Sequence, residues 1–143
     1  MVSNNKIYKS DISKLLLSSP YAVAILDREQ KIVDINDNFK KMFQYSLTEA
    51  KGKFISSLVS FEHHRKQVDK NVEKIYKGHG LKLEGERKRK DGSAVYVEIM
   101  GHPVIHRQMV VGVYILYIDV SEKKNNERQL HLFKKILEKN QKY

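Results

Sequence analysis

The sequence predicts an α+β domain: a five-stranded antiparallel sheet with flanking helices, followed by a C-terminal helix. Two short apolar runs, 22–26 and 31–35, stand on either side of a polar turn, as in a β-hairpin. Three longer segments rich in β-branched and aromatic residues follow one another between residues 81 and 120. The segments between these two groups carry apolar residues at helical spacing. Helices on one side of such a sheet would form a pocket.

A helix is expected directly after the first hairpin. Asn36 has a side chain that can cap a helix, and Phe39, Met42 and Phe43 recur at helical spacing. A second, short helix is expected to begin at residues 46–49, Ser-Leu-Thr-Glu, which have the form of a capping box. The first half of the chain is therefore predicted to run strand, strand, helix, short helix.

Three further helical segments are expected outside the strands. Residues 11–17 have the pattern of a short amphipathic helix that ends before Pro20, after a flexible leader at 1–10. Residues 54–59 are expected to form a short helical turn, and residues 61–77 the longest helix of the core. The apolar stripe and the glycine cap of this long helix are Val68, Val72, Ile75, Tyr76 and Gly78.

Turn residues separate the three strands of the second half. Residues 81–90 alternate between two faces, and Asp91-Gly92 is expected to form a two-residue hairpin turn into a strand over 93–104. Residues 106–108 form the next turn. Residues 109–120 are apolar at nearly every position, which predicts a central strand covered on both faces. One face of the first of these strands consists of Leu81, Leu83, Gly85 and Arg87.

The composition of the 143 residues excludes several classes of protein. The chain has no cysteine, which excludes disulfides, thiolate catalysis and cysteine-ligated metals. No apolar run approaches the roughly 20 residues that span a bilayer, and the N-terminus lacks the apolar core of a secretory signal. We therefore expect a cytoplasmic domain without a membrane segment.

The net charge of +10 is spread over the chain, and acidic residues are interleaved with the basic ones as on solvated helix faces. It does not predict a nucleic-acid partner, although a basic nucleic-acid-binding domain is a third alternative for the function. The chain has no P-loop and none of the common hydrolase or dinucleotide motifs. His63 and His64 are adjacent, so they cannot both lie on one helix face. We predict a non-enzymatic domain without a metal site.

The order and spacing of several short motifs resemble those of a PAS domain, the small α/β sensor module of signalling proteins. The resemblance covers roughly residues 12–122. Two positions differ from the usual pattern: Gln44 stands where the family commonly has glycine, and Ser121 stands for the threonine of the terminal Asp-x-Thr signature. The motifs are Leu26-Asp27, VDINDNF at 33–39, FQYS at 43–46, EAKGK at 49–53, RKDGS at 89–93, Pro103, Gly112 and DVSE at 119–122.

The resemblance implies a sensor domain over 11–120 and a linker helix over 121–143. In the family this helix commonly carries a signal to an effector such as a histidine kinase or a nucleotide cyclase, in two-component systems among others. Asp119 and Ser121 would relay the signal, since Asp119 ends the last strand and Ser121 can cap the helix. A homodimer is also implied. In the linker helix Leu130, Phe133 and Leu137 are spaced as in a coiled coil, but packing of this helix on the domain's own sheet is the alternative.

The resemblance leaves the cofactor undefined. Haem-binding members place their axial histidine on the long helix, at a position that corresponds to Val68, and His64 lies one turn earlier. Haem is therefore not expected. The cysteinyl-flavin photochemistry of the LOV type, like a thioester-linked chromophore, requires a cysteine that this chain lacks.

A small ligand in the pocket is the leading interpretation. The competing interpretation is that the same side chains fill the core, which leaves a module for dimerisation and protein–protein interaction. Arg87 lies either at the pocket rim, where its guanidinium could pair with a carboxylate, or at a solvent-facing strand end. The implied ligand-binding residues are Leu26, Phe39, Met42, Val72, Tyr76, Leu83, Arg87, Val97, Ile99, Ile115 and Tyr117.

Overall fold

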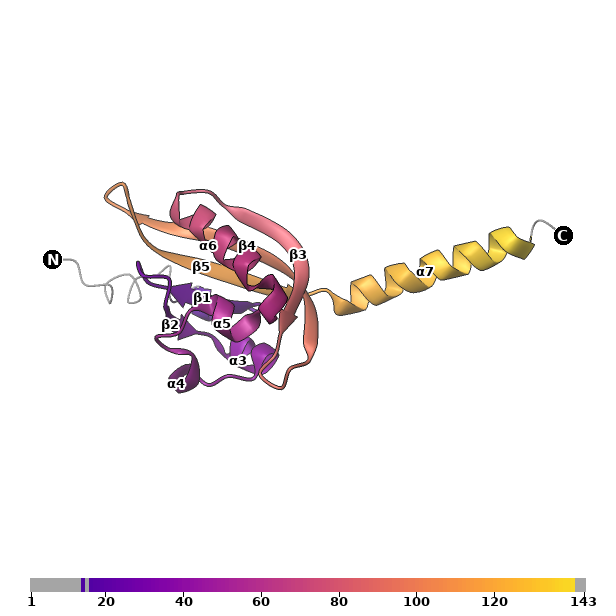
Figure 1. The fold of residues 1–143 in the computed structure, drawn as a ribbon, viewed down its shortest axis with the longest axis horizontal. Coiled ribbons are helices and arrows are strands. Elements are labelled where there is room, and N and C mark those ends of the chain that lie inside the picture. Colours follow the sequence, from indigo (N-terminus) through magenta and orange to yellow (C-terminus); the bar gives the residue numbers. More distant parts are fainter. Residues whose placement is uncertain (1–13, 15, 141–143) are drawn as a thin grey trace.

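Five antiparallel strands form one sheet in a computed structural model of the chain, which describes residues 14 and 16–140. The spatial order is β2-β1-β5-β4-β3, so the two halves of the chain meet where β1 pairs with β5 (Figure 1). The predicted fold class is confirmed. The strands are β1 (Ala22–Leu26), β2 (Ile32–Ile35), β3 (Leu81–Lys88), β4 (Ala94–His106) and β5 (Met109–Asp119).

Asn36 joins the first hairpin to helix α3 (Asp37–Phe43), as the sequence predicts. Its side-chain Oδ1 accepts the backbone N–H of Phe39 at 2.9 Å, which caps the helix, and the N–H of Val23 at 2.9 Å. Its amide nitrogen donates to the carbonyl of Tyr21 at 2.7 Å. The buried Asn36 side chain therefore holds the start of β1 against the start of α3.

Helix α3 ends at Gln44, whose backbone is left-handed with φ 70° and ψ 28°. This is the conformation that glycine adopts without steric cost. Gln44 therefore adopts at this helix end the left-handed conformation that favours glycine. The predicted capping box follows: Ser46 and Glu49 exchange side-chain and backbone hydrogen bonds at the start of α4 (Leu47–Ala50).

The predicted long helix begins with a 3₁₀ turn, η1 (Glu62–His64), and continues as α6 (Arg65–Tyr76). It follows the short α5 (Ile55–Val59). Helix α6 is terminated by Gly78, which has a positive φ of 96°. The N–H of Gly78 donates to the carbonyl of Ile75, which confirms the predicted cap.

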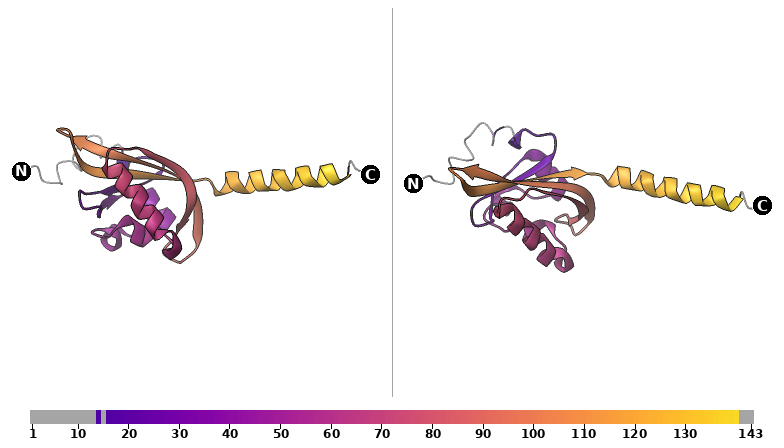
Figure 2. Two further views of the ribbon diagram at one scale, coloured as in Figure 1. Left: turned by 45° about the horizontal axis from the view of Figure 1, so that its top comes forward. Right: turned by 90° about the horizontal axis from the view of Figure 1, so that it is seen from above.

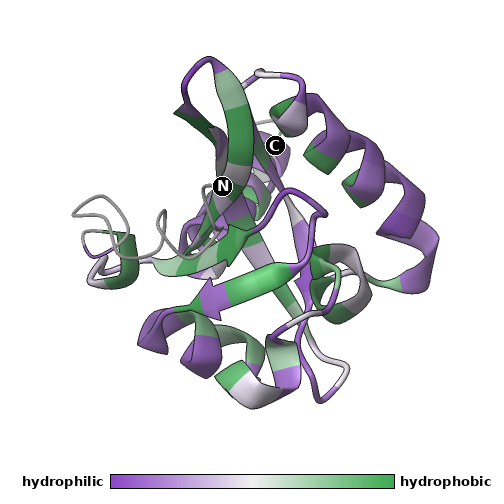
Figure 3. Cartoon of the chain, turned by 90° about the vertical axis from the view of Figure 1, so that its left-hand side faces the viewer, coloured by the Kyte–Doolittle hydropathy of each residue, from purple (hydrophilic) through white to green (hydrophobic). Residues whose placement is uncertain are grey.

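The core lies between the sheet and the helices α3 to α6. Figure 3 shows apolar residues along the strands and hydrophilic residues on much of α6. Phe39, Phe43 and Tyr117 form an aromatic cluster with ring centroids 4.7 to 5.9 Å apart. Helix α6 approaches β4 closely at Gly101, where an added Cβ would lie 2.4 Å from Cδ1 of Ile75.

Two expectations about the strands of the second half need correction. Strand β3 ends at Lys88 and strand β4 begins at Ala94. Their connection is therefore longer than the predicted two-residue turn at Asp91-Gly92. The N–H of Lys90 in this loop donates to the carbonyl of Phe43, which holds the loop against α3. Strand β5 is fully buried on only one face, whereas its alternate residues, Tyr114 among them, are half-buried.

The next hairpin turns at Arg107 and Gln108, which both have positive φ, as in the two-residue turns that match strand twist. At the other end of the chain Lys14, Leu16 and Leu17 are helical. The rest of the predicted 11–17 helix and the 1–10 leader lie outside the described residues. Within the described part, no helix is both long and apolar enough to cross a bilayer.

Helix α7 (Ser121–Asn140) leaves the end of β5 and runs away from the sheet (Figures 1 and 2). The alternative in which this helix packs on the domain's own sheet is therefore wrong for the described residues. Its apolar side chains have no cover within the described chain: those of Leu130, Leu132, Phe133, Ile136 and Leu137 are all exposed, Phe133 to 59%.

Candidate functional site

The residues predicted to line a pocket gather on the inner face of the sheet, but most of them pack against one another. Met42, Tyr76 and Leu83 are half-buried at the edge of the core. Arg87 is the one charged residue among them and is only 8% exposed. The fully packed members are Leu26, Phe39, Val72, Val97, Ile99, Ile115 and Tyr117.

An open groove of about 680 Å³ lies between α6 and the edge strand β3. We call it the α6–β3 groove. Of the predicted ligand-binding residues, Leu83 and Arg87 line it. Its remaining lining residues come from η1 and α6 (His63, His64, Gln67, Val68, Asn71), from β3 (Glu84, Gly85, Glu86) and from β4 (Tyr96).

The Arg87 side chain points inward because alternate residues of β3 face the core, and Leu83 and Gly85 precede it on that face. The solvent-facing alternative for Arg87 is therefore wrong. Gly85 lies beside it: a Cβ at Gly85 would be in ordinary van der Waals contact with Nη1 of Arg87, at 3.5 Å. Nη1 donates to the carbonyl of Glu86 at 2.8 Å.

The buried Arg87 guanidinium lies in an environment that disfavours its charge. Burial lowers its pKa, and the nearby Tyr117 hydroxyl opposes this shift only in part. Among the described residues, no carboxylate oxygen lies within 4.0 Å of it. A buried cation without an anionic partner is a group that an incoming anion would stabilise.

The helical wall of the groove carries a polar atom without a hydrogen-bond partner among the described residues. Nδ1 of His64 is buried and has no hydrogen-bond partner among the described residues. The rings of His63 and His64 contact each other at 4.1 Å between centroids, and His63 is exposed at the mouth. Asn71 is buried and accepts a hydrogen bond from Gln67 at 3.3 Å. No group of three potential metal ligands occurs in the described part of the chain.

The junction of β5 and α7 is held by the residues predicted to lie there, with one difference in their roles. Oδ1 of Asp119 accepts the N–H of Ser121 at 2.9 Å, so the cap at this helix start comes from Asp119. Ser121 is the first residue of α7, and its Oγ instead lies 3.4 Å from the backbone of Tyr96 in β4. The predicted cap by the Ser121 side chain is therefore not what the geometry shows.

A third contact at this junction involves residues that the sequence analysis did not single out. Nζ of Lys124, in the first turn of α7, lies 3.0 Å from Oε2 of Glu84 and 5.3 Å from the ring centroid of Tyr96. Glu84 raises the pKa of Lys124, and Lys124 lowers the pKa of Glu84. Glu84 and Tyr96 also line the α6–β3 groove, so the groove and the base of α7 share two residues, whose side chains contact Lys124 on the outer face of the sheet.

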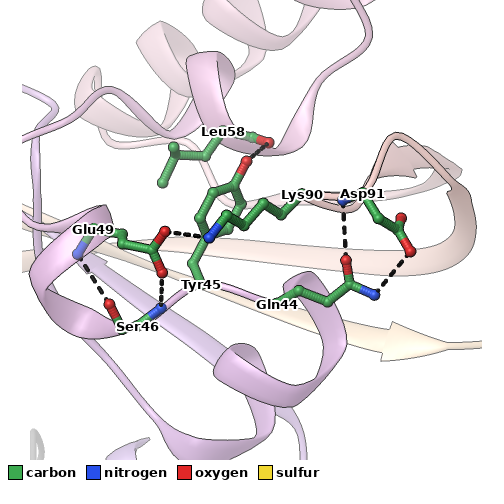
Figure 4. A network of polar contacts seen from close by, with 7 residues as sticks. All are labelled: Gln44, Tyr45, Ser46, Glu49, Leu58, Lys90 and Asp91. Atoms are coloured by element: carbon green, nitrogen blue, oxygen red, sulfur yellow. Dashed lines mark hydrogen bonds and ion pairs between the residues drawn. The ribbon is translucent and has the colours of Figure 1, made fainter.

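A separate polar network fixes the loop between β3 and β4 against α3 and α4 (Figure 4). The Gln44 amide donates to Asp91 at 3.1 Å and accepts its N–H at 3.0 Å, and Glu49 pairs with Lys90. Hydrogen bonding with Lys90 lowers the pKa of Glu49 to about 2. Hydrogen bonds from Ser93 lower the pKa of Asp91 to about 2.

Solved structures of proteins from several organisms share this arrangement of strands and helices. The PAS domain of a Colwellia psychrerythraea protein superposes with a TM-score of 0.69 at 18% identity, over 78% of this chain and 95% of that one. A LOV protein of Rhodobacter sphaeroides gives a TM-score of 0.71 at 17% identity, over 90% of this chain and 74% of that one. The PAS domain of a Burkholderia thailandensis LuxR-family transcriptional regulator was solved in complex with ethanol. It gives a TM-score of 0.62 at 13% identity, over 78% of this chain and 99% of that one.

Sequence comparison agrees with the structural likeness. No curated protein matches the chain in sequence. A family model described as the PAS fold matches residues 16–125, which include the whole sheet and the first turn of α7. The chain therefore belongs to the PAS family.

Proposed function

We propose that this chain is a non-enzymatic sensory module in which a small molecule binds in the α6–β3 groove and changes the orientation of α7. In this proposal residues 11–120 act as the sensor and residues 121–143 as the output helix. The observation that carries the proposal is the sharing of Glu84 and Tyr96 between the groove and the base of α7.

The proposed relay runs along the edge of the sheet. A ligand that contacts the inner face of β3 or β4 shifts these strands, and with them Glu84 and Tyr96, whose side chains contact Lys124 on the outer face. Asp119 keeps the first residue of α7 attached to β5 while the direction of the helix changes. The ligand shifts the equilibrium only if its affinity differs between the two orientations.

The exposed apolar side chains of α7 support a role in assembly. We propose a homodimer in which Leu130, Phe133 and Leu137 of two copies meet, and an effector such as a histidine kinase or nucleotide cyclase that reads their arrangement. The structure of the Burkholderia relative with ethanol supports the idea that this fold can hold a small ligand.

A second candidate function is dimerisation without any ligand. It is favoured by the aromatic cluster of Phe39, Phe43 and Tyr117, because these residues fill the space in which a central pocket was expected. The two candidates differ in whether small molecules stabilise the fold. In both candidates α7 forms the contact between the two copies of the chain.

Thermal unfolding of the full chain against a panel of small molecules tests the proposed function, because a ligand that binds only the native state raises the midpoint. The same ligands are then added to a chain with spin labels on two introduced cysteines, Lys74→Cys in α6 and Lys135→Cys in α7. The absence of native cysteine makes the labels specific. We expect a stabilising ligand to change the distance between the labels. Stabilisation without a change in distance would contradict the relay, and no stabilisation by any compound would favour the second candidate.

A further inference from the structure

We infer that the ligand of the α6–β3 groove is a small organic anion whose carboxylate binds Arg87. This inference rests on the proposed ligand-binding function and adds the chemical class of the ligand. It follows from the Arg87 guanidinium, which has no carboxylate partner among the described residues, from Nδ1 of His64, which has no hydrogen-bond partner there, and from the apolar residues in the same lining.

Arg87 supplies the positive charge. Its guanidinium has five N–H donors, of which one donates to the carbonyl of Glu86. The side chain is buried, and within the described chain no carboxylate pairs with it. A planar carboxylate can accept two parallel N–H bonds from a guanidinium, which is the strongest pairing open to this group.

The two acidic residues that also line the groove do not neutralise Arg87. Glu84 and Glu86 alternate with Gly85 and Arg87 along β3, so their side chains leave the sheet on the other face. Glu84 is paired with Lys124 there, and Glu86 is exposed. The inner part of the groove therefore carries the charge of Arg87 without a compensating acid.

His64 supplies the second contact, from the helical wall. His64 lines the same groove as Arg87, and its buried Nδ1 has no hydrogen-bond partner among the described residues, so a hydroxyl or carboxylate oxygen that reaches it would satisfy it. Val68 and Leu83 add apolar surface to the same lining. A volume of about 680 Å³ lies in the range of small-molecule sites, so an acid with a short apolar or aromatic body fits the lining.

Calorimetric titration of the full chain with sodium benzoate and sodium acetate, at constant ionic strength, tests this inference. Benzamide and acetamide are the controls, because they match the acids in shape and lack the charge. We expect each acid to bind about 10-fold or more tightly than its amide, since hydrogen bonds to charged groups are the stronger ones. Equal binding of acids and amides would overturn the anionic class and leave the proposed function standing.

Two variants test whether Arg87 is the positive group that binds the carboxylate. Arg87→Met is expected to weaken benzoate binding about 10-fold or more. The matched control Lys82→Met removes a positive charge from the exposed face of the same strand and is expected to leave the affinity unchanged. If both variants weaken binding equally, a general electrostatic attraction is responsible and the inference is wrong.

The position of the site is tested independently of any variant. In NMR spectra of the full chain, benzoate is expected to shift the backbone amides of His64, Gly85 and Arg87 and to leave those of the distant Arg107 turn unchanged. If benzoate binds but shifts residues elsewhere, both this inference and the placement of the ligand site in the α6–β3 groove fail. A variant Gly85→Leu, which fills the groove beside Arg87, is expected to remove the binding of acids and amides alike.

Discussion

Glu84, on the edge strand β3, pairs with Lys124, in the first turn of α7, over 3.0 Å. The contact fixes the outgoing helix to the far edge of the sheet, although α7 is covalently joined to the central strand β5. The helix base is thus held by Asp119 at the end of β5, by contacts of Ser121 and Lys124 with Tyr96 in β4, and by the ion pair with Glu84 in β3. A change at the groove can act on the contacts with β3 and β4 without breaking the hydrogen bond at Asp119.

Removal of the Lys124 charge is expected to loosen α7. In Lys124→Gln the ion pair to Glu84 and the contact with the Tyr96 ring are both lost. We expect a broader distribution of distances between spin labels at introduced cysteines 74 and 135. The unfolding midpoint should change little, because exposed ion pairs contribute little to global stability.

Lys123→Gln is the control for this prediction. It removes the same charge from the neighbouring residue, for which no ion pair occurs within the described chain. A distance distribution that broadens equally in both variants would show that net charge, rather than the contact with Glu84, holds the helix.

Acid is expected to destabilise the loop between β3 and β4. The pKa of Glu49 is lowered from 4.5 to about 2, and that of Asp91 from 3.8 to about 2. A carboxylate with a lowered pKa in the folded state stabilises the fold above its unfolded pKa, and this contribution is lost as the pH falls towards the folded value. The urea concentration at the midpoint of unfolding should therefore decrease as the pH is lowered from about 5 to about 2.

The variant Glu49→Gln identifies the group responsible. It should be less stable than the wild type at pH 7, and its midpoint should fall less between pH 5 and pH 2, since one of the two titrating carboxyl groups is gone. Glu29→Gln removes a carboxylate with an exposed side chain elsewhere and serves as the control. Identical acid profiles for Glu49→Gln and the wild type would contradict the assignment.

Local rules were sufficient to predict much of this fold from the sequence. The cap at Asn36, the capping box at Ser46 and the end of α6 at Gly78 each depend on neighbouring residues, and all three are confirmed. The order and type of the strands followed from periodicity and turn residues in the same way.

The candidate site was harder to predict because it depends on long-range contacts. The sequence grouped Arg87 with Leu83 and Gly85 on one face of its strand but left open whether Arg87 faces the core or solvent, because its burial depends on how α6 covers β3. Lys124 and Glu84 are 40 residues apart, and only the β3–β4 register and the start of α7 bring them together. No local pattern indicates such a pair.

Gln44 tests how much the left-handed end of α3 costs. The Gln44→Ala and Gln44→Gly variants both lose the side-chain hydrogen bonds to Asp91, but only glycine adopts φ 70° freely. We expect Gln44→Gly to be more stable than Gln44→Ala by about 1 kcal/mol, measured by urea unfolding at pH 7. Equal stability would show that the left-handed backbone is not strained at this position.

Arg87 is expected to reduce the stability of the unliganded fold. Its buried charge lacks an anionic partner among the described residues, and burial lowers its pKa. Replacement of buried charges by apolar groups of similar volume is often neutral or stabilising. Arg87→Met should raise the free energy of unfolding by about 1 kcal/mol in ligand-free buffer, whereas Lys82→Met, on the exposed face of β3, should not. A large loss of stability in Arg87→Met would indicate a structural role for the guanidinium.

The approach of α6 to β4 at Gly101 predicts a strong coupling between two residues. A Cβ at Gly101 would lie 2.4 Å from Cδ1 of Ile75, so Gly101→Ala should cost about 1–3 kcal/mol of unfolding free energy. Ile75→Val removes that methyl group and alone costs about 1 kcal/mol. Because the methyl group causes the clash, the double variant should be more stable than the sum of the two changes predicts, by about 1 kcal/mol. Gly85→Ala, where the new Cβ meets its neighbours at ordinary distances of 3.5 Å or more, should combine additively with Ile75→Val. Additive behaviour of Gly101→Ala with Ile75→Val would mean that α6 does not hold Ile75 against β4 as the structure describes.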